Sequence, residues 1–139
     1  IEDRIDEIRS TVKKLGGLVI LRALSPIANR FKDFNIDLAN YNLEPYTIYE
    51  TVFNDKVLNF NYIPTGLQIV KGYSSKTGLP KLSVRSLSPG SLYFYVLKDM
   101  SKLDDVSKSL AELELSGFTY PYYLGFNYLE VYTDVGFIL

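Results

Sequence analysis

Residues 84–96 decide the fold, and they read VRSLSPGSLYFYV. Both ends of this stretch are rich in apolar, β-branched and aromatic residues, which favour strands. Between them a proline and a glycine stand side by side, a pair that marks a turn. The stretch therefore predicts strands at 82–87 and 92–98, joined by a turn at 88–91.

Part of this pattern also occurs near the start of the chain. Residues 21–26 read LRALSP and residues 84–89 read VRSLSP, so both follow the order apolar, Arg, small, Leu, Ser, Pro. Arg22 and Arg85 are 63 residues apart. The match indicates an internal repeat.

A second match places a glutamate third in an aromatic strand. Residues 48–53 read IYETVF and residues 128–133 read YLEVYT, which makes Glu50 and Glu130 counterparts 80 residues apart. The larger offset fits a second unit that carries a full helix where the first carries a short one.

The N-terminal segment 1–15 is expected to be a helix, because its apolar residues are spaced 4, 3, 4, 3 as in a coiled-coil seam: Ile1, Ile5, Ile8, Val12 and Leu15. The glycine pair at 16–17 ends it. Two interpretations stay open. The helix packs on its own domain, or it is the end of a longer linker or dimerisation helix.

The remaining elements follow from local patterns. Apolar residues spaced 3, 4, 3 predict a helix at 101–115 that stops at Gly117. The sequence Asn54-Asp55 between two alternating runs predicts a hairpin turn. Further strands are expected at 18–24, 46–53, 57–63, 67–73, 118–124, 126–132 and 136–139.

Together these elements predict an α+β fold. After an N-terminal linker or coiled-coil helix at 1–16, two pseudo-symmetric β-β-α-β-β units form antiparallel half-sheets around a central cleft. The units cover about residues 18–66 and 80–139 of a single domain, 17–139. Ligands commonly bind in clefts of this kind.

Composition excludes several functions. The 139 residues carry a formal net charge of −1, so a stand-alone nucleic-acid binder is not expected. The chain has no His and no Cys, which rules out His-dependent triads, disulfides and Cys/His zinc sites. We assign no catalytic residue, metal site or cofactor, and expect a non-enzyme.

Targeting signals are also missing from the sequence. The longest apolar run, residues 18–21, is far shorter than the about 20 residues of a membrane span. We therefore expect a cytoplasmic protein with no membrane partner.

Glu130 is the focal candidate for binding. In a strand, Tyr128, Glu130 and Tyr132 point to one face while Leu129 and Val131 point to the other. A carboxylate in a cleft needs a tyrosine hydroxyl or a proton when no ligand is bound. An entering lipophilic cation would restore the charge pair and gain cation–π attraction.

Four further residues are candidates for the same cleft. Glu50 is the counterpart of Glu130, and Tyr49 lies on the opposite face of its strand. Tyr93 and Tyr95 share one face of the strand 92–98. We expect the all-apolar face opposite them to form the core, which leaves the tyrosines for the cleft.

The chain resembles the gyrase-inhibitor-like effector-binding domain of BmrR-type (MerR-family) and Rob-like (AraC-type) transcription regulators. The resemblance covers about residues 18–139 and is carried by residues 85–96, the helix 101–115 with its exit SGF at 116–118, LEVY at 129–132 and NYIP at 61–64.

This resemblance implies a small-molecule effector-binding domain. It implies that Glu130 contacts cationic, drug-like ligands and that an aromatic residue near position 49 lines the pocket. It also implies that DNA is bound only through a separate domain, and that the helix 1–15 permits a homodimer.

Two other functions stay open. One is a stand-alone small-molecule binding protein or hydrolase of the same fold, with Glu50 and Glu130 as an acid pair. The other is a structural assembly module in which exposed tyrosines form a protein–protein surface.

Overall fold

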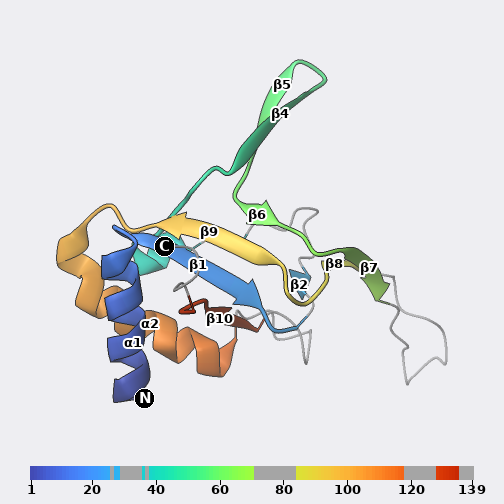
Figure 1. The fold of residues 1–139 in the computed structure, drawn as a ribbon. Helices are drawn as coiled ribbons and strands as arrows, with labels where there is room; N and C mark the ends of the chain where they lie inside the picture. The colour runs from blue at the N-terminus through green and yellow to red at the C-terminus, as the bar shows by residue number, and fades with distance from the viewer. Residues whose placement is uncertain (26, 29–35, 37, 71–83, 118–127, 135–139) are drawn as a thin grey trace.

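The computed structural model has an α+β fold with an N-terminal helix, antiparallel sheets and a second helix towards the C-terminus (Figure 1). It describes residues 1–25, 27–28, 36, 38–70, 84–117 and 128–134. The elements are α1 (Glu2–Lys14), β1 (Leu18–Ala23), β2 (Ile27–Ala28), η1 (Ala39–Tyr41), β3 (Glu44–Pro45), β4 (Tyr49–Phe53), β5 (Lys56–Phe60), β6 (Tyr62–Ile63), β7 (Leu67–Val70), β8 (Val84–Leu87), β9 (Leu92–Val96), η2 (Met100–Lys102), α2 (Leu103–Ser116) and β10 (Leu129–Val131).

The main sheet has β1 at its centre. Its strand order is β10-β1-β9-β3, and β6 also pairs with β9, next to β3 along the same edge. All pairs are antiparallel. Leu21 lies opposite Tyr93 on one side and Val131 on the other, so β1 joins the middle of the chain to its C-terminal part.

A second, smaller sheet continues the main one. Its order is β2-β8-β7. In the β1–β9 pair and in the β2–β8 pair the numbers of facing residues add to 114, as in Leu18↔Val96 and Ile27↔Leu87. A single antiparallel register therefore runs through both ladders, on either side of the two Ser-Pro segments.

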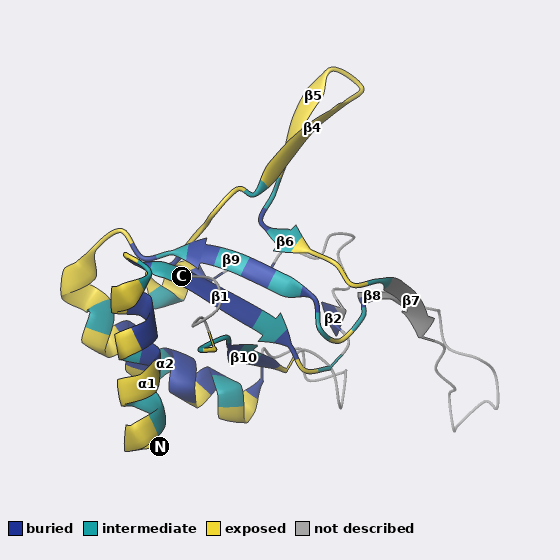
Figure 2. Ribbon diagram, viewed as in Figure 1, coloured by how far each residue is buried: buried dark blue, intermediate teal, exposed yellow. Residues whose placement is uncertain are grey.

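The two helices cover one face of the main sheet, and the core lies between the helices and this face (Figure 2). The buried apolar side chains come from both helices and from the sheet: Ile8, Val12, Val106, Leu110, Leu113, Val19, Leu21, Ala23, Leu129 and Val131. The helices predicted at 1–15 and 101–115 are confirmed, apart from a 3-10 turn at the start of the second.

The apolar stripe of α1 packs inside its own domain. Ile8 is 0% and Val12 1% exposed, and Ile5 is partly buried against the same core. A helix that buries its apolar stripe on its own domain has no seam left for a partner helix. The structure therefore favours the first interpretation, in which the helix packs on its own domain, and a homodimer through this helix stays a prediction.

The core face of β9 is the opposite of the one expected from the sequence. Tyr93 and Tyr95 are fully buried, while Leu92, Phe94 and Val96 are only half-buried. Buried tyrosines need a partner for the hydroxyl, and that of Tyr95 donates to the carbonyl oxygen of Ile36 at 2.6 Å. Both rings therefore belong to the core.

The β4–β5 hairpin projects from the edge of the main sheet as an insertion between β3 and β6 (Figure 1). Its turn residues Asn54 and Asp55 have φ values of 51° and 60°, as a type I′ turn requires, so the predicted turn is confirmed. Phe94 anchors its base, because its carbonyl accepts from the Tyr46 N–H and its N–H donates to the carbonyl of Asn61.

The predicted strands 118–124 and 136–139 lie outside the described residues, as do residues 71–73 of the strand predicted at 67–73, whose first part forms β7. Among the residues that are described, neither helix is long and apolar enough to cross a membrane.

Candidate functional site

Strand β10 places Glu130 on the face of the sheet away from the helices. Leu129 and Val131 are 1% and 2% exposed on the helix side, whereas Glu130 and Tyr132 are half-buried on the other side. This alternation is the one predicted for the strand. Tyr128 precedes the strand, and its side chain is exposed.

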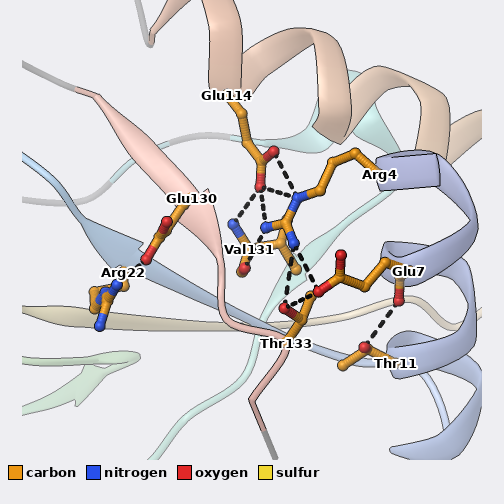
Figure 3. Close-up of polar contacts among 8 residues, drawn as sticks. All are labelled: Arg4, Glu7, Thr11, Arg22, Glu114, Glu130, Val131 and Thr133. Atoms are coloured by element: carbon orange, nitrogen blue, oxygen red, sulfur yellow. Dashed lines mark hydrogen bonds and ion pairs between the residues drawn. The ribbon is translucent and has the colours of Figure 1, made fainter. Parts of the chain in front are cut away.

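The charge partner of Glu130 is an arginine. Arg22 lies directly opposite Glu130 in the β1–β10 pair, and its Nη2 atom forms an ion pair and hydrogen bond with Glu130 Oε1 (Figure 3). In this role we expected, from the sequence, a tyrosine hydroxyl or a proton. That expectation is wrong because sheet register brings a cation from position 22 across to position 130.

The ion pair remains open to water. The side chain of Arg22 is 44% exposed and that of Glu130 is 28% exposed. The Arg22 guanidinium carbon also lies 5.8 Å from the ring centre of Tyr132, within cation–π distance. Exposed ion pairs contribute about 0–1 kcal/mol to stability, so a competing charge can displace one at little cost.

A groove of about 370 Å³ runs beside this pair. Its size lies at the lower end of the roughly 300–1,000 Å³ of small-molecule sites. The groove is lined from α1, β1, α2 and the segment after Leu129 by Arg4, Arg22, Glu114, Glu130, Val131, Tyr132, Thr133 and Asp134. Such a lining suits a small molecule that carries charge.

The helix side of the groove is closed by a second ion pair. Arg4 donates from Nη2 to Glu114 Oε1 at 2.6 Å and from Nε to Oε2 at 2.9 Å. The same two side chains satisfy the backbone of β10, since Val131 N–H donates to Glu114 at 2.9 Å and its carbonyl accepts from Arg4 at 2.7 Å. We call Arg4, Glu114 and Val131 the clamp.

Thr133 extends the clamp along α1. Its hydroxyl accepts from Arg4 Nη1 at 3.2 Å and donates to Glu7 Oε1 at 2.7 Å. This hydrogen bond lowers the pKa of Glu7, and the hydrogen bond from Arg4 to Glu114 raises the pKa of Arg4. Both shifts favour the charged forms of Glu7 and Arg4.

Glu50 and Tyr49 do not reach the groove. Both are exposed on the hairpin, where Glu50 faces Asn59 and the ring of Tyr49 stacks on Phe60 at 4.9 Å. Glu50 and Glu130 therefore lie in different sheets and do not form the acid pair considered for a hydrolase. Tyr93 and Tyr95, buried in the core, also lie away from the groove.

Sequence reasoning missed most of the residues that line the groove. Arg22 had a visible signal, because the repeated motif has an arginine at the same place in both copies, Arg22 and Arg85. Arg4 and Glu114 had none, since a charged residue on an amphipathic helix is usually solvated. Thr133 follows the predicted strand 126–132 and had none either.

Among the described residues no group of three or more His, Cys, Asp or Glu side chains is arranged to hold a metal ion. Comparison of the chain with known protein families and with curated proteins finds no match.

Proposed function

We propose that the chain is a small-molecule effector-binding domain of the gyrase-inhibitor-like type, and that its ligand is a lipophilic or amphipathic organic cation. The observation that carries the proposal is the Arg22–Glu130 pair, which lies half-exposed beside Tyr132 in the groove. At such a site the Glu130 carboxylate can exchange its internal partner, Arg22, for a cation that enters from solution.

The ligand replaces Arg22 as the partner of Glu130. Breaking the exposed pair costs about 0–1 kcal/mol, because the guanidinium is already 44% exposed and becomes hydrated. An aromatic cation regains that energy from the carboxylate and from the Tyr132 ring, whose face contributes about 0.5–2 kcal/mol. The apolar part of the ligand packs against Tyr132, the aromatic residue in the lining of the groove.

The pairing of strands supports two related halves. Strand β1 of the first half pairs with β9 and β10 of the second half. In the same way, β8 of the second half pairs with β2 and β7, which precede it in the chain. If β1 is exchanged with β8, β9 with β2 and β10 with β7, the first set of strand pairs becomes the second. The β1–β9 and β2–β8 pairs also share one register, which is compatible with the 63-residue offset between Arg22 and Arg85. These relations favour the pseudo-symmetric arrangement of the resembled domains.

The same relation assigns Glu130 a different counterpart. Glu130 lies opposite Arg22, and Ile69 lies opposite Arg85. Glu50 is in the hairpin instead, so the repeat does not relate it to Glu130. The proposed site is therefore acidic in one half only, which suits a ligand with a single positive charge.

The link to regulation goes through α1. Arg4 contacts the carbonyl of Val131 and, with Glu7, the hydroxyl of Thr133, the two residues that flank Tyr132. A ligand that moves β10 thereby acts on the N-terminal helix. In the proposed function DNA is bound by a separate domain attached to this helix.

Titration of tyrosine fluorescence with tetraphenylphosphonium tests the proposal, since the chain contains no Trp. We expect Glu130→Gln to weaken binding at least about tenfold, or ~1.4 kcal/mol. Arg22→Gln should strengthen it by removing the internal competitor. The matched control is Glu44→Gln, which breaks the exposed pair with Lys98 at another edge of the same sheet and should change nothing.

The proposal requires that Glu130→Gln and Arg22→Gln change the affinity for tetraphenylphosphonium in opposite directions. Equal binding by wild type and Glu130→Gln overturns the proposal. Loss of binding in Arg22→Gln with gain in Glu130→Gln overturns the cationic ligand in favour of an anion.

A further inference from the structure

Nearly all residues of the β4–β5 hairpin are exposed (Figure 2), and its apolar side chains lie on both faces of the two strands. Val52, Phe53 and Val57 are 69%, 66% and 61% exposed. A two-stranded hairpin in water is marginally stable at best, and apolar residues gathered on a projecting element mark an interaction site. The described structure therefore leaves the hairpin incomplete.

The turn determines which backbone N–H and C=O groups of β4 are not bonded to β5. In a two-residue hairpin the residues that flank the loop, Phe53 and Lys56, form a hydrogen-bonded pair. Hydrogen bonding alternates along a strand, so Thr51 also bonds inward to β5. The N–H and C=O groups of Glu50 and Val52 consequently point outward, and form an edge to which another strand can add.

We propose that β4 pairs with β4 of a second copy of this chain, antiparallel and centred on Thr51. In this register Glu50 and Val52 of each copy face Val52 and Glu50 of the other, which makes four backbone hydrogen bonds. Thr51 faces its own copy, and Tyr49 faces Phe53. Threonine pairs and aromatic pairs at directly opposite positions are among the stabilising cross-strand combinations.

Charge and sequence favour a second copy over an unrelated strand. The hairpin is self-complementary in this register, since Glu50 meets a valine and no two like charges face each other. The edge of β5 is less suited, because Lys56 stands there and edge lysines discourage strand addition.

The area involved sets the expected strength. Large aromatic side chains measure about 150–250 Å² each, so the two-thirds-exposed Phe53 and its neighbours offer several hundred Å² per copy. This is below the about 800 Å² per partner of a standard interface. We therefore expect a reversible dimer with a dissociation constant in the micromolar range.

A matched pair of proline variants tests the edge. Val52 and Val57 face each other across the hairpin, and each directs its N–H outward, on β4 and β5 respectively. Proline removes only this outward donor. Sedimentation velocity across a concentration series should show Val52→Pro as a monomer and Val57→Pro as a dimer like the wild type.

Disulfide trapping provides a second test, because the chain contains no Cys. Thr51→Cys should form a covalent dimer under mild oxidation, whereas Leu58→Cys, its neighbour across the hairpin, should not. Both substitutions leave the backbone donors in place, so this test stands even if a proline variant unfolds.

A wild-type chain that stays monomeric at every concentration overturns the proposal. So does efficient crosslinking by Leu58→Cys in place of Thr51→Cys, which assigns the contact to β5, or a dimer that both prolines leave intact. The inference is independent of ligand binding, and dimerisation should be unchanged in Glu130→Gln.

Discussion

Replacing Glu114 by alanine is expected to lower the free energy of unfolding by about 2–4 kcal/mol. The carboxylate accepts hydrogen bonds from two nitrogens of Arg4 and from the backbone N–H of Val131, and its side chain is only 15% exposed. Its removal takes this acceptor from two residues on different elements, Arg4 on α1 and Val131 on β10.

The magnitude is the sum of two losses. The Val131 N–H loses its acceptor, which for a buried donor costs about 1–3 kcal/mol. Arg4 loses its shortest charge contact, but it is 27% exposed and keeps Glu7 and Thr133, so this loss is nearer ~1 kcal/mol. Glu114→Gln keeps an oxygen for Val131 and should lose only about half as much.

Urea denaturation followed by circular dichroism measures the difference. The control is Glu112→Ala, the same substitution at an exposed position two residues earlier on α2, which should change stability by less than about 0.5 kcal/mol. Equal stabilities of Glu114→Ala and Glu112→Ala would refute the clamp.

Three further predictions concern stability. Gly17→Ala should destabilise by at least ~2 kcal/mol in the same denaturation assay, because the residue has φ +102° and a Cβ there would lie 2.6 Å from the carbonyl oxygen of Leu97; an unchanged midpoint would refute this. Tyr95→Phe should lose about 1–3 kcal/mol by leaving the carbonyl of Ile36 without its donor, and a loss below ~0.5 kcal/mol would contradict the buried hydrogen bond. The pKa of Glu7 is lowered in the folded chain, so its carboxylate stabilises the fold at pH values above 4.5, the ordinary pKa of a glutamate. This contribution is lost as the pH falls through the folded-state pKa, so Glu7→Gln should lose less stability than wild type on acidification. Parallel pH profiles of stability for the two proteins would count against it.

Local sequence was sufficient where structure depends on near neighbours. The helix α2 follows from the spacing of Leu103, Val106 and Leu110, and the hairpin turn from Asn54 and Asp55. Each pattern lies within a few residues, so the backbone conformation it favours needs no distant partner.

The faces of β9 show where local sequence fails. Alternation defines two faces, but both carry large apolar or aromatic groups, so it does not say which one the helices cover. The acceptor that allows Tyr95 to be buried is the carbonyl of Ile36, 59 residues away. Only the folded topology supplies it.

The candidate site divides in the same way. Strand alternation correctly placed Glu130 away from the core, because it is a property of three successive residues. Its partner Arg22 is 108 residues away, and Arg4 and Glu114 are 110 residues apart. Such pairs depend on strand register and helix packing, which a single sequence does not specify.

The most direct test of the proposed site is an NMR titration of the ¹⁵N-labelled chain with tetraphenylphosphonium. Saturable shifts are predicted for the amides of Arg22, Glu130 and Tyr132 and, through the clamp, of Arg4, with none in the hairpin at Tyr49 or Glu50. Absence of saturable shifts, or shifts centred on the hairpin, would contradict a ligand site at the Arg22–Glu130 pair.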